Sequence, residues 1–98
     1  MPVYMIIEAK EVKDKNGYGQ YIRQVPETIA KFGGRYLARG GKVKVAAGDW
    51  NPGRVIILEF PSMDKYEAWW NSPEYRAVAP LREKSARVNA VVVEGLKE

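Results

Sequence analysis

Residues 54–60 read RVIILEF, the most apolar strand-like run of the chain. Aliphatic and β-branched side chains favour a strand. Side chains alternate between the two faces of a strand, so Ile56 and Leu58 share one face and Val55 and Ile57 share the other. Both faces are therefore apolar. Such a strand is typical of a sheet that is covered on both sides rather than wet on one.

Three further parts of the chain are predicted to form strands. They are residues 3–11, residues 35–47 and residues 87–95. The middle part is expected as two segments, 35–39 and 42–47, with Gly40 and Gly41 forming a bend or bulge between them. The sequence NPG at residues 51–53 predicts a turn that leads into RVIILEF.

The first predicted helix lies between the first two strands. Its apolar residues recur at helical spacing and are Tyr18, Tyr21, Ile22, Val25, Ile29 and Phe32. Asp14 or Asn16 can cap its start, and Gly33 is expected to end it. Pro26 lies inside this stripe and removes the hydrogen bond to the carbonyl of Ile22. We therefore expect either a kink or two short helices.

A second helical region follows RVIILEF. Ser62 can cap it, and its inner side is predicted to carry Met63, Tyr66, Trp69 and Trp70. Ser72 and Pro73 then have the residue types of an N-cap and a first helical position, with a further kink expected at Pro80. Trp69 and Trp70 point about 100° apart, so one is expected in the core and the other at a pocket or interface.

The predicted order of elements is β-α-β-β-α-β, which is the ferredoxin-like α+β arrangement of a four-stranded antiparallel sheet with helices on one face. The 98 residues are enough for a single domain, 1–98, and not for two. The opposite face of the sheet would carry about eight apolar side chains, each worth about 1.5–3 kcal/mol when buried. We therefore expect a homodimer formed through that face.

The amino-acid composition limits the cofactors and partners that can be expected. The chain has no Cys and no His, so we expect no metal, no haem and no other cofactor. Its net charge is +4, but the basic residues are spread along the chain and interleaved with acids, so we expect no nucleic-acid partner. The start MPVYMIIEAKEV resembles neither a secretion signal nor a membrane span. A cytoplasmic protein with no membrane partner is predicted.

The glycines of GGRYLARGG, residues 33–41, do not form a phosphate-binding loop. That motif would need Gly at Tyr36 and Ser or Thr at Val43. We interpret the glycines as backbone bends on either side of a strand.

Five stretches in this order resemble one known family over nearly the whole chain. They are FGGRYLARGG at 32–41, EFPS at 59–62, WNSPEYRA at 70–77, the Arg82 of LRE, and VEG at 93–95. The sequence is similar to the domain-of-unknown-function 1330 family, within the dimeric α/β-barrel superfamily. The resemblance implies two ferredoxin-like protomers packed sheet to sheet. It implies no particular reaction.

The candidate ligand-binding residues are Arg39, Glu59, Trp70, Ser72, Tyr75 and Arg82. An arginine beside a buried sheet face can pair with a carboxylate or bind an anionic ligand, and Glu59 is the natural partner of Arg39. A structural ion pair is an equally good interpretation of the two. Ser72 is explained as a helix cap, whereas Tyr75 can donate its hydroxyl into a cavity.

Two functions remain in competition at this point. The first is a small-molecule binding protein or cofactor-independent enzyme with a mostly apolar cavity between sheet and helices. The second is a non-catalytic dimeric structural or interaction module, in which the same residues form mutual salt bridges without open volume. An RNA-binding sheet ranks third, because RVIILEF presents aliphatic side chains where such sheets present aromatic ones. The sequence leaves open whether the protein is an enzyme.

Overall fold

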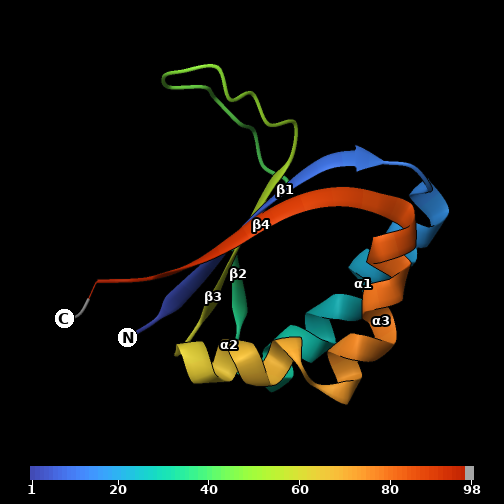
Figure 1. Ribbon diagram of the computed structural model, residues 1–98, viewed down its shortest axis with the longest axis vertical. Coiled ribbons are helices and arrows are strands. Elements are labelled where there is room, and N and C mark those ends of the chain that lie inside the picture. Colours follow the sequence, from blue (N-terminus) through green and yellow to red (C-terminus); the bar gives the residue numbers. More distant parts are fainter. Residues whose placement is uncertain (97–98) are drawn as a thin grey trace.

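The computed structural model describes residues 1–96. Its elements are β1 (Val3–Val12), α1 (Lys15–Lys31), β2 (Arg35–Arg39), β3 (Val55–Phe60), α2 (Met63–Trp70), α3 (Pro73–Ser85) and β4 (Ala86–Glu94). The strands form one antiparallel sheet in the order β2-β3-β1-β4. All three helices lie on the same side of this sheet (Figure 1). The predicted ferredoxin-like α+β fold is confirmed, with the second helical region divided into α2 and α3.

Helix α1 begins where the sequence predicts and runs unbroken through Pro26. The Asp14 side chain accepts hydrogen bonds from the backbone amides of Asn16 and Gly17. The expectation of two short helices is wrong. The carbonyl of Ile22, which Pro26 cannot reach with an amide, accepts a hydrogen bond from Nη2 of Arg39 at 3.2 Å. This contact compensates the defect and joins α1 to the end of β2.

Serine caps begin the other two helices. Ser62 Oγ accepts from the amide of Lys65, and Ser72 Oγ accepts from the amide of Tyr75. Pro73 occupies the first turn of α3, and Pro80 lies within it without ending it. Trp69 fixes α2 to α1, because its indole N–H donates to the hydroxyl of Thr28 at 2.9 Å. These caps match the sequence prediction.

The core lies between the inner face of the sheet and the helices. Its buried residues are Val3, Met5, Val25, Ile29, Ile56, Leu58, Phe60, Trp69, Tyr75, Val78 and Ala79. Alternation along β3 sends Ile56, Leu58 and Phe60 inward, while Val55 and Ile57 turn to the outer face. RVIILEF therefore contributes to both faces, as its pattern predicts.

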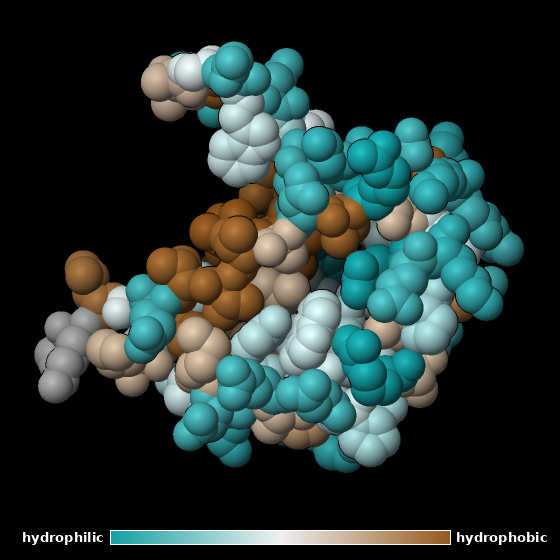
Figure 2. All heavy atoms as spheres, in the orientation of Figure 1, coloured by the Kyte–Doolittle hydropathy of each residue, from teal (hydrophilic) through white to brown (hydrophobic). Residues whose placement is uncertain are grey.

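The outer face of the sheet has no helix over it. Ile6 and Ile57 pair across β1 and β3 and are only partly buried, while Val91 and Val93 on β4 are 62% and 49% exposed. Figure 2 shows hydrophobic side chains gathered over the sheet beside the loop that joins β2 to β3. A patch of this kind marks an interaction surface.

The second half of the predicted middle strand does not exist. Residues 42–47 belong to a loop that projects from the sheet (Figure 1). The amide of Gly40 donates to the carbonyl of Val55, which is where β3 begins. Residues after Gly40 thus have no strand beside them within the described chain. The loop bends at residues 47–49 and again at Gly53, the last residue of the predicted turn at 51–53.

The paired glycines serve backbone geometry and close packing. Gly33 follows α1 with a φ of 81°, and Gly40 follows β2 with a φ of 72°. Gly34 does not have a positive φ. A Cβ at Gly34 would, however, lie 2.6 Å from Cε1 of Phe60 and 2.7 Å from Cγ2 of Ile29. Both neighbours are buried in the core. Gly34 therefore lets the chain pass directly over the core at the start of β2.

Substitution of Gly34 by Ala should destabilise the fold by about 1–3 kcal/mol, because the added methyl group overpacks the contact between Phe60 and Ile29. Urea unfolding measures the change. Gly41→Ala is the matched control, since a Cβ at Gly41 meets nothing within 4 Å, and it should stay within about 0.5 kcal/mol of the wild type. Equal stabilities for the two variants would contradict this account.

Candidate functional site

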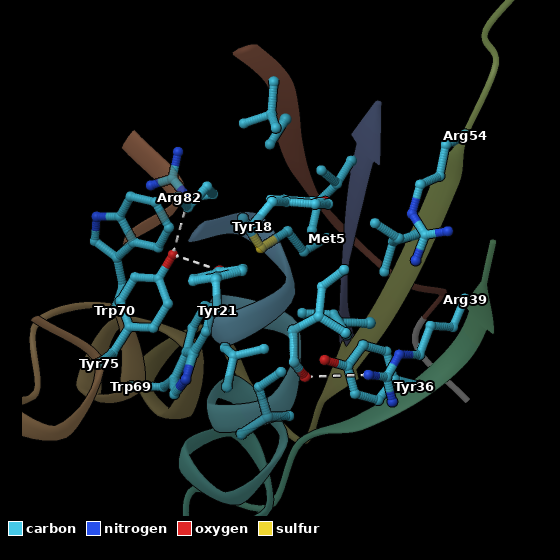
Figure 3. Close-up of a pocket in the computed structure, with 18 residues that line it drawn as sticks. Met5, Tyr18, Tyr21, Tyr36, Arg39, Arg54, Trp69, Trp70, Tyr75 and Arg82 are labelled. Atoms are coloured by element: carbon cyan, nitrogen blue, oxygen red, sulfur yellow. Dashed lines mark hydrogen bonds between the residues drawn. The ribbon is translucent and has the colours of Figure 1, made fainter. Parts of the chain in front are cut away.

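A cavity lies between the inner face of the sheet and the helices. The centre of a water molecule can move within about 70 Å³ of it. A single bound water needs about 10–15 Å³ of such space, so a molecule of several heavy atoms fits. Half of the 18 lining residues are aliphatic, namely Met5, Ile7, Ile22, Val25, Ile29, Ile56, Leu58, Val88 and Ala90. The three arginines stand at the two ends of the cavity (Figure 3). This is the usual composition of a small-molecule site.

Two tyrosines and an arginine form the helical end of the cavity. The hydroxyl oxygens of Tyr21 on α1 and Tyr75 on α3 are 2.9 Å apart, and Nε of Arg82 donates to the Tyr75 oxygen at 3.3 Å. The hydrogen bond between the two tyrosines uses the hydroxyl hydrogen of one of them. The hydroxyl hydrogen of the other tyrosine has no acceptor within the cluster, whichever tyrosine is the donor. The cluster therefore has a hydroxyl donor and a guanidinium available to an oxygen atom in the cavity.

Tyr21 and Arg82 each keep one protonation state at neutral pH. Desolvation, with the neighbouring Tyr75 as a smaller cause, raises the pKa of Tyr21 far above its usual value of 10.0. Burial alone would lower the pKa of Arg82, but the two tyrosine oxygens beside it raise the pKa overall. At neutral pH Tyr21 is a neutral hydroxyl and Arg82 is a cation.

Trp69 and Trp70 lie in different surroundings, as the sequence predicts. Trp69 is 1% exposed and belongs to the core, whereas Trp70 is half-buried and lies against Tyr75 with ring centroids 5.2 Å apart. The guanidinium of Arg82 lies 6.0 Å from the Trp70 ring. Trp70 thus forms a wall beside the Tyr75–Arg82 contact.

The other end of the cavity is formed at the edge of the sheet. Arg39 is exposed there and lies over the ring of Tyr36, with Cζ 4.6 Å from the ring centroid. Burial raises the pKa of Tyr36, and the charge of Arg39 opposes that shift. Arg54, which precedes β3, also lines this end.

The charges of the lining all have one sign. Arg39, Arg54 and Arg82 line the cavity, and none of the described lining residues is Asp or Glu. None of these three arginines forms an ion pair with a described acid. The two salt bridges among residues 1–96 are Lys31–Glu74 and Arg35–Glu59. An anionic group would therefore be attracted to this cavity.

The predicted partnership of Arg39 with Glu59 is wrong. Nε of Arg35 donates to Oε1 of Glu59 at 2.6 Å on the outer face. An unpaired residue, Leu37, forms a bulge between Tyr36 and Ala38, which changes the face of every residue after it. Arg39 consequently pairs with Ile56 and faces the helices. Without the bulge it would have shared the face of Glu59.

Four of the six predicted site residues come together at the cavity, namely Arg39, Trp70, Tyr75 and Arg82. Glu59 lies on the opposite face. Ser72 is buried beside the cavity without lining it, and its hydroxyl donates to the Trp69 carbonyl while accepting from the Tyr75 amide. The cap interpretation of Ser72 is confirmed.

Sequence reasoning missed Tyr21 and Arg54. Tyr21 belongs to the apolar stripe of α1, and the signal that distinguishes it is a hydroxyl on a face that packs against another helix. Arg54 precedes the strand RVIILEF, and nothing in that pattern indicates where its side chain goes.

The described residues, 1–96, contain neither a cluster of metal-ligating side chains nor a helix that could span a membrane. No group of three acidic side chains within residues 1–96 could hold a metal ion. None of the three helices is long and apolar enough to cross a membrane.

Fold and cavity together define a ferredoxin-like α+β protein with a cationic pocket between its sheet and helices. The model of the family described as Domain of unknown function (DUF1330) matches residues 2–96, and the chain belongs to this family. The resemblance drawn from the sequence is thereby confirmed. No curated protein matches this sequence.

Solved structures with the same fold are distant in sequence. A protein of unknown function from Rhodopseudomonas palustris is 19% identical with a TM-score of 0.75, and the match covers 99% of this chain and 84% of that one. A dimeric ferredoxin-like protein of unknown function from Thermobifida fusca is 20% identical, with a TM-score of 0.65 and coverage of 94% and 89%. A Dabb family protein with a ferredoxin-like fold from Mesorhizobium loti is 9% identical, with a TM-score of 0.68 and coverage of 98% of each chain. These likenesses concern the fold.

The raised pKa of Tyr21 predicts a loss of stability in alkali. An unfolded chain releases this proton near pH 10, whereas the folded chain holds it, so the contribution of Tyr21 is present below about pH 10 and falls as the pH rises. The stability of the wild type relative to Tyr21→Phe should decrease by about 1 kcal/mol between about pH 9 and pH 11. Urea unfolding at the two pH values measures this difference. A difference that stays constant would contradict the assigned environment.

Proposed function

We propose that the protein binds a small organic anion in the cavity between sheet and helices. The observation that carries this proposal is the lining itself, which has three arginines, no described acid and an aliphatic centre. Arg54 and Arg82 are partly buried, and a partly desolvated cation without a carboxylate partner is unfavourable, so an anionic ligand would stabilise it. The aliphatic wall then contacts the apolar body of the ligand.

The ligand's carboxylate lies at the cluster of Tyr21, Tyr75 and Arg82. Arg82 offers its remaining N–H groups, and the tyrosine pair offers the one hydroxyl hydrogen that is not used internally. Hydrogen bonds between ionised groups are about twice as strong as neutral ones. The half-buried Trp70 ring closes the side of this end.

The chemistry of the lining favours binding over acid–base catalysis. The described lining residues include no carboxylate, histidine or lysine that could take a proton at neutral pH. The cluster of Tyr21, Tyr75 and Arg82 can instead stabilise negative charge on an oxygen atom. If the protein is an enzyme, its residues would act by stabilising such a charge, with the proton acceptor supplied by the substrate.

The competing function, a non-catalytic dimeric module, predicts that the same residues are consumed in mutual salt bridges. The open volume and the unpaired arginines of the cavity favour a binding protein. A homodimer is compatible with both functions. We propose that two copies pack through the outer face of the sheet, which is apolar and has no described element over it. Three solved structures of this fold are described as dimeric.

The binding proposal is tested with monocarboxylates from propanoate to hexanoate, measured by calorimetry and thermal melting. At least one should bind the wild type, and Arg82→Gln should weaken that binding about tenfold or more, because it removes a charged hydrogen-bond donor.

Arg76→Gln is the matched control for this experiment. Arg76 lies on the same helix, exposed, with Cζ 5.0 Å from the Trp70 ring centroid, but it does not line the cavity. Its affinity for the same acid should match the wild type. Equal losses in both variants would indicate unspecific attraction of anions, and no binding by the wild type would reject the proposed function.

The dimer proposal predicts that light scattering gives twice the 11.1 kDa mass of one chain. Ile57→Glu places a charge in the centre of the outer face and should produce monomers or unfolded chains, because the charge would have to be buried. Ala77→Glu, at an exposed position of α3, should leave the dimer intact. A wild-type mass near 11.1 kDa would contradict the proposal.

A further inference from the structure

The end of the cavity away from Arg82 is also cationic. Arg39 and Arg54 both line it, and Figure 3 shows their side chains at the edge of the sheet, with Met5 and aliphatic side chains between them and the Tyr75–Arg82 contact. Both charges act on the hydroxyl of Tyr36. The two arginines therefore share one small region, without a described acid beside them.

Arg54 is incompletely satisfied. Its Nε is buried and has no hydrogen-bond partner among the described residues, which is rare for a charged donor. The backbone on either side is held, because the Arg54 carbonyl accepts from the amide of Ala9 and the Val55 carbonyl accepts from the amide of Gly40. The backbone that carries Arg54 is thus held in place, and its buried Nε is a donor that still needs an acceptor.

Gly40 makes this position of Arg54 available. A Cβ at residue 40 would lie 2.5 Å from Nη1 and 2.9 Å from Cζ of Arg54, so the guanidinium lies directly against the glycine backbone. Only glycine adopts the φ of 72° found there without strain. The guanidinium of Arg54 thereby lies beside the residue that follows Arg39 in the chain. Arg39 and Arg54 stand at the same end of the cavity, and no described acid forms an ion pair with either (Figure 3).

Arg39 is already fixed by other contacts. Its Nη2 donates to the Ile22 carbonyl, and its guanidinium lies over the Tyr36 ring. These contacts leave its remaining N–H groups without a described acceptor, and a guanidinium offers five N–H donors in a planar fork that suits a carboxylate. Arg39 and Arg54 therefore both have N–H groups to offer to an anionic group at this end of the cavity.

We propose that Arg39 and Arg54 form a second anion-binding end of the cavity, so that the ligand is a small dianion with an acidic group at each end of an apolar body. This inference rests on the proposed function, which places the first acidic group at Arg82. A dicarboxylate has the required chemistry. The aliphatic wall between the two ends would contact its methylene groups.

The experiment compares dicarboxylates with monocarboxylates of equal chain length: succinate, glutarate and adipate against butyrate, valerate and hexanoate. Calorimetry at fixed ionic strength gives the affinities, and thermal melts verify that each variant folds. At least one diacid should bind the wild type about tenfold or more tightly than its monoacid, because the second carboxylate gains charged hydrogen bonds.

The variants separate the two ends. Arg54→Gln should remove the preference for the diacid while keeping the affinity for the monoacid, whereas Arg82→Gln should weaken both. Arg54→Lys keeps the charge but loses the planar fork, and it should restore only part of the preference. Arg23→Gln removes a charge from an exposed position of α1 outside the cavity and should leave the preference unchanged.

The outcomes distinguish this inference from the function on which it rests. If monoacids bind and no diacid binds more tightly, the second end is rejected and the proposed function survives. The second end is likewise rejected if Arg54→Gln weakens both series equally, or if Arg23→Gln removes the preference as Arg54→Gln does. If no acid of either series binds the wild type, both proposals are rejected.

Discussion

The sheet of this protein is apolar on both faces, and both faces must therefore be kept from water. Helices α1, α2 and α3 cover one face, with Phe60 and Trp69 filling the contact at the end nearest α2. The other face keeps Val91 and Val93 exposed within residues 1–96 of one protomer. The proposed homodimer would cover this face and remove its apolar side chains from water. The two apolar faces of RVIILEF thus link the fold of one chain to the proposed assembly.

The covered face is not filled completely, and the cavity has a physical cause. Helix α1 packs against α3, and Tyr21 meets Tyr75 through its hydroxyl as well as through the edge of its ring. A buried hydroxyl needs a partner, which the two tyrosines and Arg82 supply to one another. This polar cluster cannot pack against the aliphatic face of the sheet without losing hydrogen bonds. The space between them remains open, with the polar groups at its end.

Local chemistry allowed much of the fold to be predicted. The caps at Asp14, Ser62 and Ser72 and the strand RVIILEF depend on neighbours in sequence, and all are present. The bulge at Leu37 depends on how β2 pairs with β3, which no local pattern specifies. One extra residue moved Arg39 to the helix side and left Glu59 with Arg35. Trp70, Tyr75 and Arg82 were still found together, because Tyr75 and Arg82 are two turns apart on α3 and Trp70 ends the preceding helix.

Pro26 and Arg39 show how a local defect in a helix contributes to the cationic cavity. A proline within α1 leaves the Ile22 carbonyl without an amide, and that carbonyl must find another donor. Arg39 supplies one because the bulge at Leu37 turns it toward the helices. The same contact holds the guanidinium at the mouth of the cavity over Tyr36. Satisfying the carbonyl leaves the charge of Arg39 uncompensated, since a carbonyl is not an anion. The backbone requirement of α1 and the attraction of the cavity for anions therefore have a common origin in one side chain.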